Sequence, residues 1–183
     1  MENSLLHQQQ TNMVTIVPAT AADAVLLSEV GGRSLIESHG NSAPAAVMQA
    51  YRERSFSVAA LEIELADRSN VFHLILHKGQ PAGYSKIIYH QPLAQVPQQR
   101  ITKLERLYLL SEYYSLKLGH QLLQFNISLS KAQGEEGMWL YVWKGNERAI
   151  RFYERVGFRT IGEGQFRLTE SHANEAWKML LTY

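Results

Sequence analysis

The chain has no cysteine, and this absence excludes several kinds of chemistry. Without a thiol it can form no disulfide, no thiolate metal site and no covalent intermediate on a cysteine nucleophile. The HExxH pattern of zinc hydrolases is also missing. His73 and His77 would lie ~13 Å apart on one face of a strand, which is too far apart to share a metal. We therefore expect no metal site.

Two further features are absent, an excess of charge of one sign and a long apolar run. The 18 lysines and arginines nearly balance the 17 aspartates and glutamates, so nothing indicates a nucleic-acid-binding or membrane-binding surface. No segment approaches the ~18 apolar residues that a membrane helix needs, and the N-terminus lacks the pattern of a secretory signal. We expect a cytoplasmic protein with a flexible tail over residues 1–12 and a single domain over residues 13–183.

The first half of the chain predicts a strand, a group of helices and a β-hairpin. β-Branched residues favour a strand over 13–18, and helical spacing follows over the ranges 21–30, 44–53 and 57–67. We expect Gly31-Gly32 to interrupt the first helix, because glycine disfavours a helix interior, with a further helical stretch up to Ser38. Two strands then form a hairpin, over 71–77 and 82–90 with a connection at 78–81.

The second half predicts a strand–helix–strand crossover. Its elements are a strand over 101–110, a helix over 117–133 and an apolar strand over 137–143, and such a unit places its two strands parallel. A short helix and two closing strands follow, the strands over 158–161 and 177–181. The order indicates an α/β (α+β) fold with a mixed, mostly antiparallel sheet flanked by helices.

The segment 142–158 carries the most informative motif. Asn146 stands where a helix N-cap would stand, Gly157 ends the helix, and Tyr153 lies two turns along the same face as Asn146. This Asn-x-x-Ala-x-x-x-Tyr pattern closely resembles the end of the fold in GNAT N-acetyltransferases. The similarity covers nearly the whole chain from about residue 14. Within that superfamily, residues 37–87 and the part after Gly157 are similar to PaiA-like spermidine/spermine acetyltransferases.

The resemblance implies a catalytic acid and a catalytic base. In the family the tyrosine hydroxyl lies beside the thioester sulfur of acetyl-CoA, which makes Tyr153 the acid that neutralises the leaving thiolate. A glutamate at the position of Glu105 often serves as the base that takes the proton of the amine. Two plainer interpretations stay open: Tyr153 as a packed aromatic residue, and Glu105 as an ion-pair partner or a solvent-facing side chain.

The segment that would hold coenzyme A departs from the family pattern. That pattern, Arg/Gln-x-x-Gly-x-Gly/Ala, opens the long helix and holds the pyrophosphate on backbone N–H groups. Here Tyr114 replaces the Arg or Gln, Lys117 replaces the first glycine, and only Gly119 matches. A bulge near the strand end at 108–110 is also implied, aiming an N–H at the thioester oxygen. The implied coenzyme A contacts are Tyr108, Leu109, Leu110, Ser115, Leu116, Lys117, Leu118, Gly119, His120, Asn146, Ala149 and Tyr153.

The implied function is acetyl-CoA-dependent transfer of an acetyl group to the primary amine of a small molecule, by direct attack. A polyamine is the first candidate acceptor. Glu37, Glu53 and Glu62 fall in the expected acceptor region, and their negative charge favours a cationic acceptor.

Several alternatives remain open. The acceptor can instead be a peptide or protein N-terminus or an antibiotic. The incomplete phosphate segment also suggests a non-catalytic acyl-CoA-binding module. The row of Arg148, Arg151 and Arg155 is interpreted as a solvated helix face, with proximity to a phosphate on the adenosine side of the cofactor as the alternative. Enzymes of this family are often dimers, which leaves a homodimer open.

Overall fold

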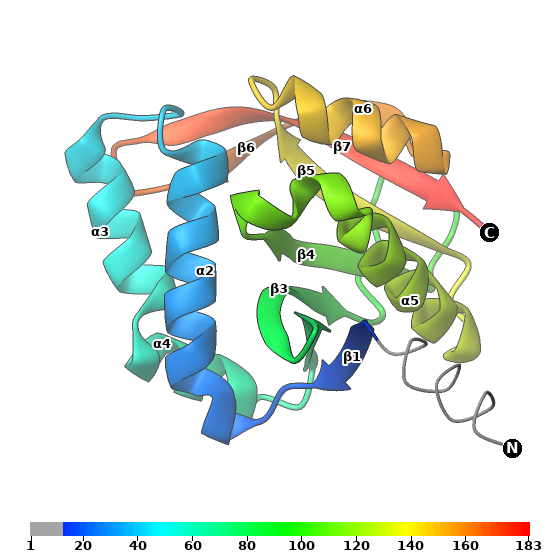
Figure 1. Ribbon diagram of the computed structural model, residues 1–183. Coiled ribbons are helices and arrows are strands. Elements are labelled where there is room, and N and C mark those ends of the chain that lie inside the picture. The colour runs from blue at the N-terminus through cyan, green and yellow to red at the C-terminus, as the bar shows by residue number, and fades with distance from the viewer. Residues whose placement is uncertain (1–12) are drawn as a thin grey trace, which may run out of the picture.

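The computed structural model describes residues 13–183, and the predicted tail over residues 1–12 lies outside them. Seven strands form a sheet in the order β1-β2-β3-β4-β5-β7-β6. Every neighbouring pair is antiparallel except β4 and β5, which run parallel (Figure 1). The predicted mixed, mostly antiparallel sheet is confirmed. The strands are β1 (Val14–Pro18), β2 (Asn70–His77), β3 (Gln80–Ile88), β4 (Ile101–Leu109), β5 (Gly137–Trp143), β6 (Arg159–Arg167) and β7 (Ala173–Thr182).

Helices cover both faces of this sheet. On one side α2, α3 and α4 group together, and α5 and α6 lie on the other (Figure 1). The order of helices and strands agrees with the prediction. Within residues 13–183, none of the helices has the length and apolar character needed to cross a membrane. The helices are α2 (Ala24–His39), α3 (Ala45–Phe56), α4 (Val58–Ala66), α5 (Leu118–Ala132) and α6 (Glu147–Val156), with short 3-10 turns η1 (Ala21–Asp23) and η2 (Ser111–Leu116).

The predicted interruption at Gly31-Gly32 is wrong, because α2 runs through both glycines without a break. A Cβ atom on Gly31 would lie 2.7 Å from the Phe56 ring and 3.1 Å from the Tyr84 hydroxyl, so a larger residue would not fit. Glycine at this point allows α2 to approach its neighbours closely. The close packing of α2 on Phe56 and Tyr84 outweighs the ~1 kcal/mol by which glycine disfavours a helix interior.

The two closing strands are longer than predicted. The β6–β7 ladder runs from the pair Arg159 and Leu180 to the pair Arg167 and Ala173, whereas the sequence favours only 158–161 and 177–181. Gly162 and Gly164 weaken the local strand preference of β6. Pairing with β7, which local propensity does not show, holds the full strand in place.

The parallel pair β4 and β5 is in contact over a short stretch only. Three residue pairs join the strands, Ile101 with Gly137, Thr102 with Met138 and Lys103 with Trp139. We call these three pairs the β4–β5 seam. Beyond it the two strands separate, so the backbone edges that they turn toward each other have no partner strand. The predicted parallel crossover is confirmed. The parts of β4 and β5 that follow the seam are not paired with each other.

A β-bulge in β4 lies immediately beyond the seam. Lys86 of β3 pairs with Arg106 and Ile87 pairs with Leu104, so Glu105 has no partner on β3. A bulge bends the strand that carries it, which helps β4 to leave β5. The bulge expected at 108–110 is therefore wrong in position, because Tyr108 and Leu109 pair regularly with β3.

The bulge also places the Arg106 side chain on the face of the sheet opposite to Leu104. Leu104 packs in the same cluster as Leu123 and Ile127 of α5, whereas Arg106 pairs with Glu64 of α4 on the opposite face. In a regular strand, residues two apart share a face, so Leu104 and Arg106 would lie on the same side. The extra residue breaks that alternation. Arg106 is therefore directed toward the three-helix side of the sheet.

Candidate active site

A cleft of about 730 Å³ opens where β4 and β5 separate. Further walls come from the C-terminal end of α2, η2, the start of α5 and the face of α6 that is turned inward, and Phe166 of β6 and Asn174 of β7 also line the cleft. Among its lining residues are Glu105, Tyr108, Leu109, Lys117, Gly119, His120, Trp143, Asn146, Ala149 and Tyr153. The cleft thus brings together many, but not all, of the residues predicted from scattered motifs. Among residues 13–183, no three His, Asp or Glu side chains gather where they could hold a metal ion.

The start of α5 presents unpaired backbone N–H groups to this cleft. Lys117 is the N-cap residue of α5, and its carbonyl accepts a hydrogen bond from the Gln121 N–H at 3.2 Å. The N–H groups of Leu118, Gly119 and His120 precede that bond, and no side chain within residues 13–183 caps them. Three donors and the positive end of the helix dipole therefore face one place, which suits an anion.

Lys117, which replaces the first glycine of the family pattern, has a backbone conformation that glycine adopts without steric cost. Its φ of 58° and ψ of 16° lie in the left-handed region, which costs a non-glycine residue about 1 kcal/mol. The change of side chain therefore leaves the backbone path into α5 intact. Lys117 adds a positive charge beside the open N–H groups, and it lines the cleft.

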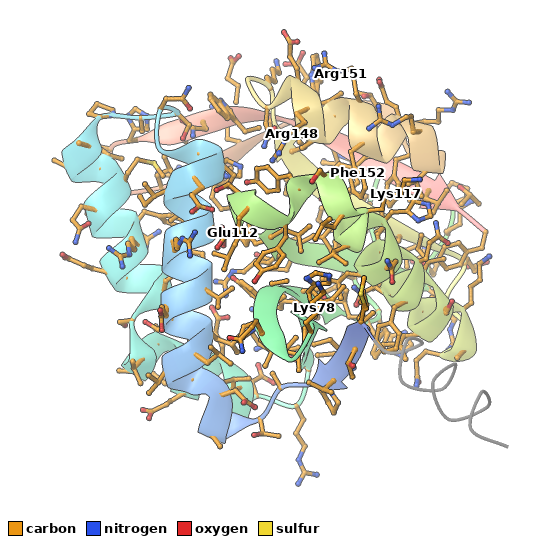
Figure 2. All side chains as sticks on the ribbon, in the orientation of Figure 1. Lys78, Glu112, Lys117, Arg148, Arg151 and Phe152 are labelled. Carbon is orange, nitrogen blue, oxygen red and sulfur yellow. The ribbon has the colours of Figure 1, made fainter. Side chains whose placement is uncertain are left out.

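Arg148 of α6 supplies a second cation. Its guanidinium lies 3.5 Å from the centroid of the Tyr114 ring, at the position where the family has Arg or Gln. Figure 2 shows Arg148 and Phe152 between α6 and the start of α5, with Arg151 directed outward. All three arginines are exposed, in agreement with the solvated-face interpretation, and Arg151 pairs with Glu147 on the surface. Arg148 and Arg155 also line the cleft.

Tyr153 reaches the cleft from a packed position on α6. The ring is 9% exposed and lies edge-on to Phe152 and Phe158, with centroids 5.1 and 5.5 Å away. Burial raises the pKa of the Tyr153 hydroxyl above its usual range, so the group is protonated at neutral pH. No hydrogen bond within residues 13–183 occupies this hydroxyl, which leaves its proton available to a ligand. The packed-aromatic interpretation and the functional one are compatible here.

Asn146 and Gly157 define the ends of α6 as predicted. The Asn146 Oδ1 accepts the Ala149 N–H at 3.1 Å, and Gly157 ends the helix with a φ of 111°. This capped helix fixes the direction in which Tyr153 points. Asn146 and Ala149 line the cleft as well.

Glu105 lies in the cleft with its charge already compensated. Lys103 Nζ is 2.5 Å from Glu105 Oε2, and the same ammonium lies over the rings of Trp139 and Tyr141. Glu105 also borders a smaller hollow of about 180 Å³ that Phe166 helps to line. The predicted base is therefore at the site, but its nearest neighbour is a cation of the same strand.

Some of the predicted coenzyme A contacts lie elsewhere. Leu110 is buried with the α2–α4 core, and Leu116 is directed to solvent. Ser115 and Leu118 do not line the cleft either, although the N–H of Leu118 is one of the open donors. Leu118 packs its side chain with Ile75 and Ala82 instead.

The carboxylates expected around the acceptor do not line the cleft, so that expectation is wrong. Glu37 pairs with Arg33 and accepts the Ser111 N–H, and Glu53 pairs with Gln49. Glu62 is exposed. Among residues 13–183, Glu105 is the one carboxylate that lines the cleft. Sequence reasoning overlooked His39, which lines the cleft from α2; as a lone histidine at a helix end, it belongs to no motif.

Comparison with known proteins points to the same family as the motif at residues 142–158. The profile of the Acetyltransferase (GNAT) family matches residues 35–158. An uncharacterized N-acetyltransferase in the pepI 3′ region of Lactobacillus delbrueckii subsp. lactis is 24% identical over 162 residues, which are 88% of this chain and 94% of that protein.

Two solved structures share the fold. The PaiA N-acetyltransferase of Thermoplasma acidophilum, in complex with coenzyme A, has a TM-score of 0.74 at 21% identity, covering 93% of this chain and 99% of that one. A putative acetyltransferase of Salmonella typhimurium with acetyl-CoA has a TM-score of 0.69 at 16% identity, covering 93% and 94%. The resemblance to GNAT enzymes is confirmed by the family match over more than half of the sequence. The chain belongs to the GNAT family of acetyltransferases.

Proposed function

We propose that the protein transfers the acetyl group of acetyl-CoA to the primary amine of a small molecule. The observation that carries this proposal is the coincidence of three features in one cleft. They are the open edges of β4 and β5, the uncapped start of α5 and the buried hydroxyl of Tyr153.

The cleft fits acetyl-CoA in both shape and chemistry. The pantetheine arm contains two amides, which match the unpaired backbone edges beyond the β4–β5 seam. The pyrophosphate matches the open N–H groups of Leu118, Gly119 and His120, with Lys117 and Arg148 adding charge. The volume of about 730 Å³ lies within the usual range of ligand sites, ~300–1,000 Å³.

Tyr153 would act on the leaving sulfur. Its raised pKa keeps the O–H intact, so the hydroxyl can donate a hydrogen bond as negative charge develops on the sulfur. Full proton transfer to a thiolate, whose conjugate acid has a pKa near ~8.5, is uphill from a buried phenol. Tyr153 therefore contributes mainly by stabilising the developing charge in a site shielded from water.

The acceptor is a small primary amine, and a polyamine remains a candidate through the resemblance to PaiA-like enzymes. A polyamine carries several positive charges, whereas the one lining carboxylate, Glu105, is already paired with Lys103. An acceptor with a single amine has fewer positive charges that need a carboxylate partner in the cleft. A peptide N-terminus satisfies the same condition and is the second candidate.

The experiment is a coenzyme A release assay over a panel of amines. The panel contains spermidine, a short diamine, an aromatic monoamine and a peptide with a free N-terminus, and the expected result is turnover of at least one member. Calorimetry with acetyl-CoA accompanies the assay. Binding of acetyl-CoA without turnover of any amine would favour the non-catalytic binding module, and absence of binding would reject both functions.

A further inference from the structure

His39 lies across the gap between the two separated strands. Its ring stands edge-on to Tyr108 of β4, with centroids 5.9 Å apart and an angle of 87°, and lies 6.0 Å from the ring of Trp143 of β5. It lines the cleft that also contains Tyr153. The imidazole therefore stands on the α2 side of the gap in which the thioester would lie.

Hydrogen bonds around Ser38 assign the ring proton of His39. Ser38 Oγ is 2.7 Å from the Ser34 carbonyl, which can only accept, so the single hydroxyl proton goes there. Ser38 Oγ is also 2.6 Å from His39 Nδ1 and must accept in that contact. Nδ1 consequently carries the hydrogen, and Nε2 has the free lone pair.

The Nε2 atom is open to a ligand. No hydrogen bond to it occurs within residues 13–183, and it is not among the buried, unpaired atoms of that range, so it retains access to the cleft. A lone pair with no protein partner, on a ring fixed from its other nitrogen, is arranged to accept a hydrogen from something that enters the cleft.

The surroundings keep this imidazole neutral. Burial lowers the pKa of His39 to about 4, and the positive charge of Arg148 on α6 adds to the effect. From β4 the titratable Tyr108 faces the ring, and Glu105 and Arg106 line the same cleft, whereas β5 contributes the non-titratable Trp143. At neutral pH the free lone pair is therefore not blocked by a proton.

We propose that His39 Nε2 accepts the proton of the acceptor amine during acetyl transfer, an inference that rests on the proposed function. The amine nitrogen attacks the thioester carbon and forms the C–N bond. Its excess proton passes to Nε2, and the C–S bond breaks as Tyr153 hydrogen-bonds the departing sulfur. The proton then leaves the imidazolium for the thiolate or for solvent, so the products are the amide and free coenzyme A.

A weakly basic imidazole suits this step because the nitrogen becomes far more acidic once it has bonded to the carbonyl carbon. Such a base does not deprotonate a free ammonium ion, and Arg148 disfavours a cation beside the ring. The site therefore selects the uncharged form of the amine. Acceptors whose amines have a pKa nearer to neutrality are expected to react faster.

The test compares His39→Gln with Glu105→Gln, using the best amine of the panel and the full-length protein. We expect His39→Gln to lower kcat about 10²–10³-fold while the acetyl-CoA affinity measured by calorimetry stays the same. Glu105→Gln should have a clearly smaller effect on kcat. Ser38→Ala, which releases the Nδ1 hydrogen, should give a loss between these two.

Chemical rescue separates proton transfer from simple packing. His39→Ala leaves space in an open cleft, and added imidazole should restore part of its kcat, in proportion to the neutral form of imidazole as the pH is varied. A wild-type kcat in His39→Gln would overturn the proposal, and so would the absence of rescue in a folded His39→Ala that still binds acetyl-CoA. In contrast, a wild-type protein that turns over no amine would reject the proposed function itself, and this inference with it.

Discussion

The two ends of the cleft differ in the kind of chemical group that faces a ligand. Toward α5 the groups that face a ligand belong to the backbone, namely the open N–H groups of the helix start and the free edges beyond the β4–β5 seam. Toward α2 they are side chains, above all His39 and Glu105. The backbone end has tolerated replacement of a glycine by Lys117 because the chain path is unchanged. At the side-chain end the chemistry depends on the identity of each residue, and we expect this end to influence which acceptor reacts.

The largest effect is expected for kcat when Tyr153, which lies between the two ends of the cleft, is changed. Tyr153→Phe removes one oxygen and retains the packed ring, so acetyl-CoA should still bind while kcat falls about 10²–10³-fold. Steady-state kinetics and calorimetry measure the two quantities separately. Tyr183→Phe is the matched control, because it removes a buried, unpaired hydroxyl that does not line the cleft. Equal kcat values in the two variants would assign Tyr153 to packing alone.

The side-chain end depends on an ion cluster beneath it. Glu64 binds Arg106 at 2.7 and 2.9 Å and Lys86 at 3.2 Å, joining α4 to β3 and to β4 just beyond the bulge. Glu64→Gln leaves two largely buried cations without their anion and should lower the free energy of unfolding by about 3 kcal/mol, measured by urea denaturation. We expect KM for the amine to rise more than the dissociation constant of acetyl-CoA.

Glu62→Gln, on the exposed side of the same helix, is the control for that measurement. It should change the free energy of unfolding by less than ~0.5 kcal/mol. If Glu64→Gln weakened acetyl-CoA binding as much as amine binding, the two ends of the cleft could not be treated as separate.

The backbone end also carries two cationic side chains, Lys117 and Arg148. Arg148→Ala removes the cation stacked on Tyr114 and should raise the dissociation constant of acetyl-CoA about tenfold, by loss of a charge-assisted contact. Binding should also become less sensitive to salt. Arg151→Ala, which breaks only a surface pair with Glu147, should leave the affinity unchanged. Equal affinities in both variants would remove Arg148 from the binding site.

The smallest expected effect tests the strained residue at the start of α5. Lys117→Gly relieves about 1 kcal/mol of left-handed strain and loses about half of it to the greater freedom of glycine in the unfolded chain. A net gain of about 0.5 kcal/mol should appear as a slightly higher melting temperature. Lys117→Ala retains the strain and removes the charge, so a gain in that variant would contradict the conformational explanation.

The sequence predicted the parts that local rules govern. The order of the elements and the capped helix between Asn146 and Gly157 follow from patterns within a few residues. The placement of Tyr153 in the cleft was implied by the resemblance to GNAT enzymes and not by its spacing alone. The parts that it missed depend on distant neighbours. Gly31 in α2 allows close packing against Phe56, and the bulge at Glu105 is defined only by pairing with β3.

Dependence on distant neighbours also explains why His39 was missed. His39 is an isolated histidine in the sequence and becomes significant only beside Tyr108 and Trp143, which come from two strands more than sixty residues farther along the chain. Arg148 was noted in the sequence as part of an arginine row, but its contact with Tyr114 on η2 exists only in the folded chain. Neither contact has a local signature, since each joins elements that meet only in the folded chain.

The short β4–β5 seam has a consequence for how ligand binding can be observed. Three residue pairs and the crossover helix connect β1–β4 to the remaining strands, so the sheet consists of two half-sheets with a gap between them. The amide hydrogens that line this gap are open to exchange with deuterium from solvent. A bound acetyl-CoA would bridge the two edges, so occupancy should appear as slowed exchange confined to the facing edges of β4 and β5.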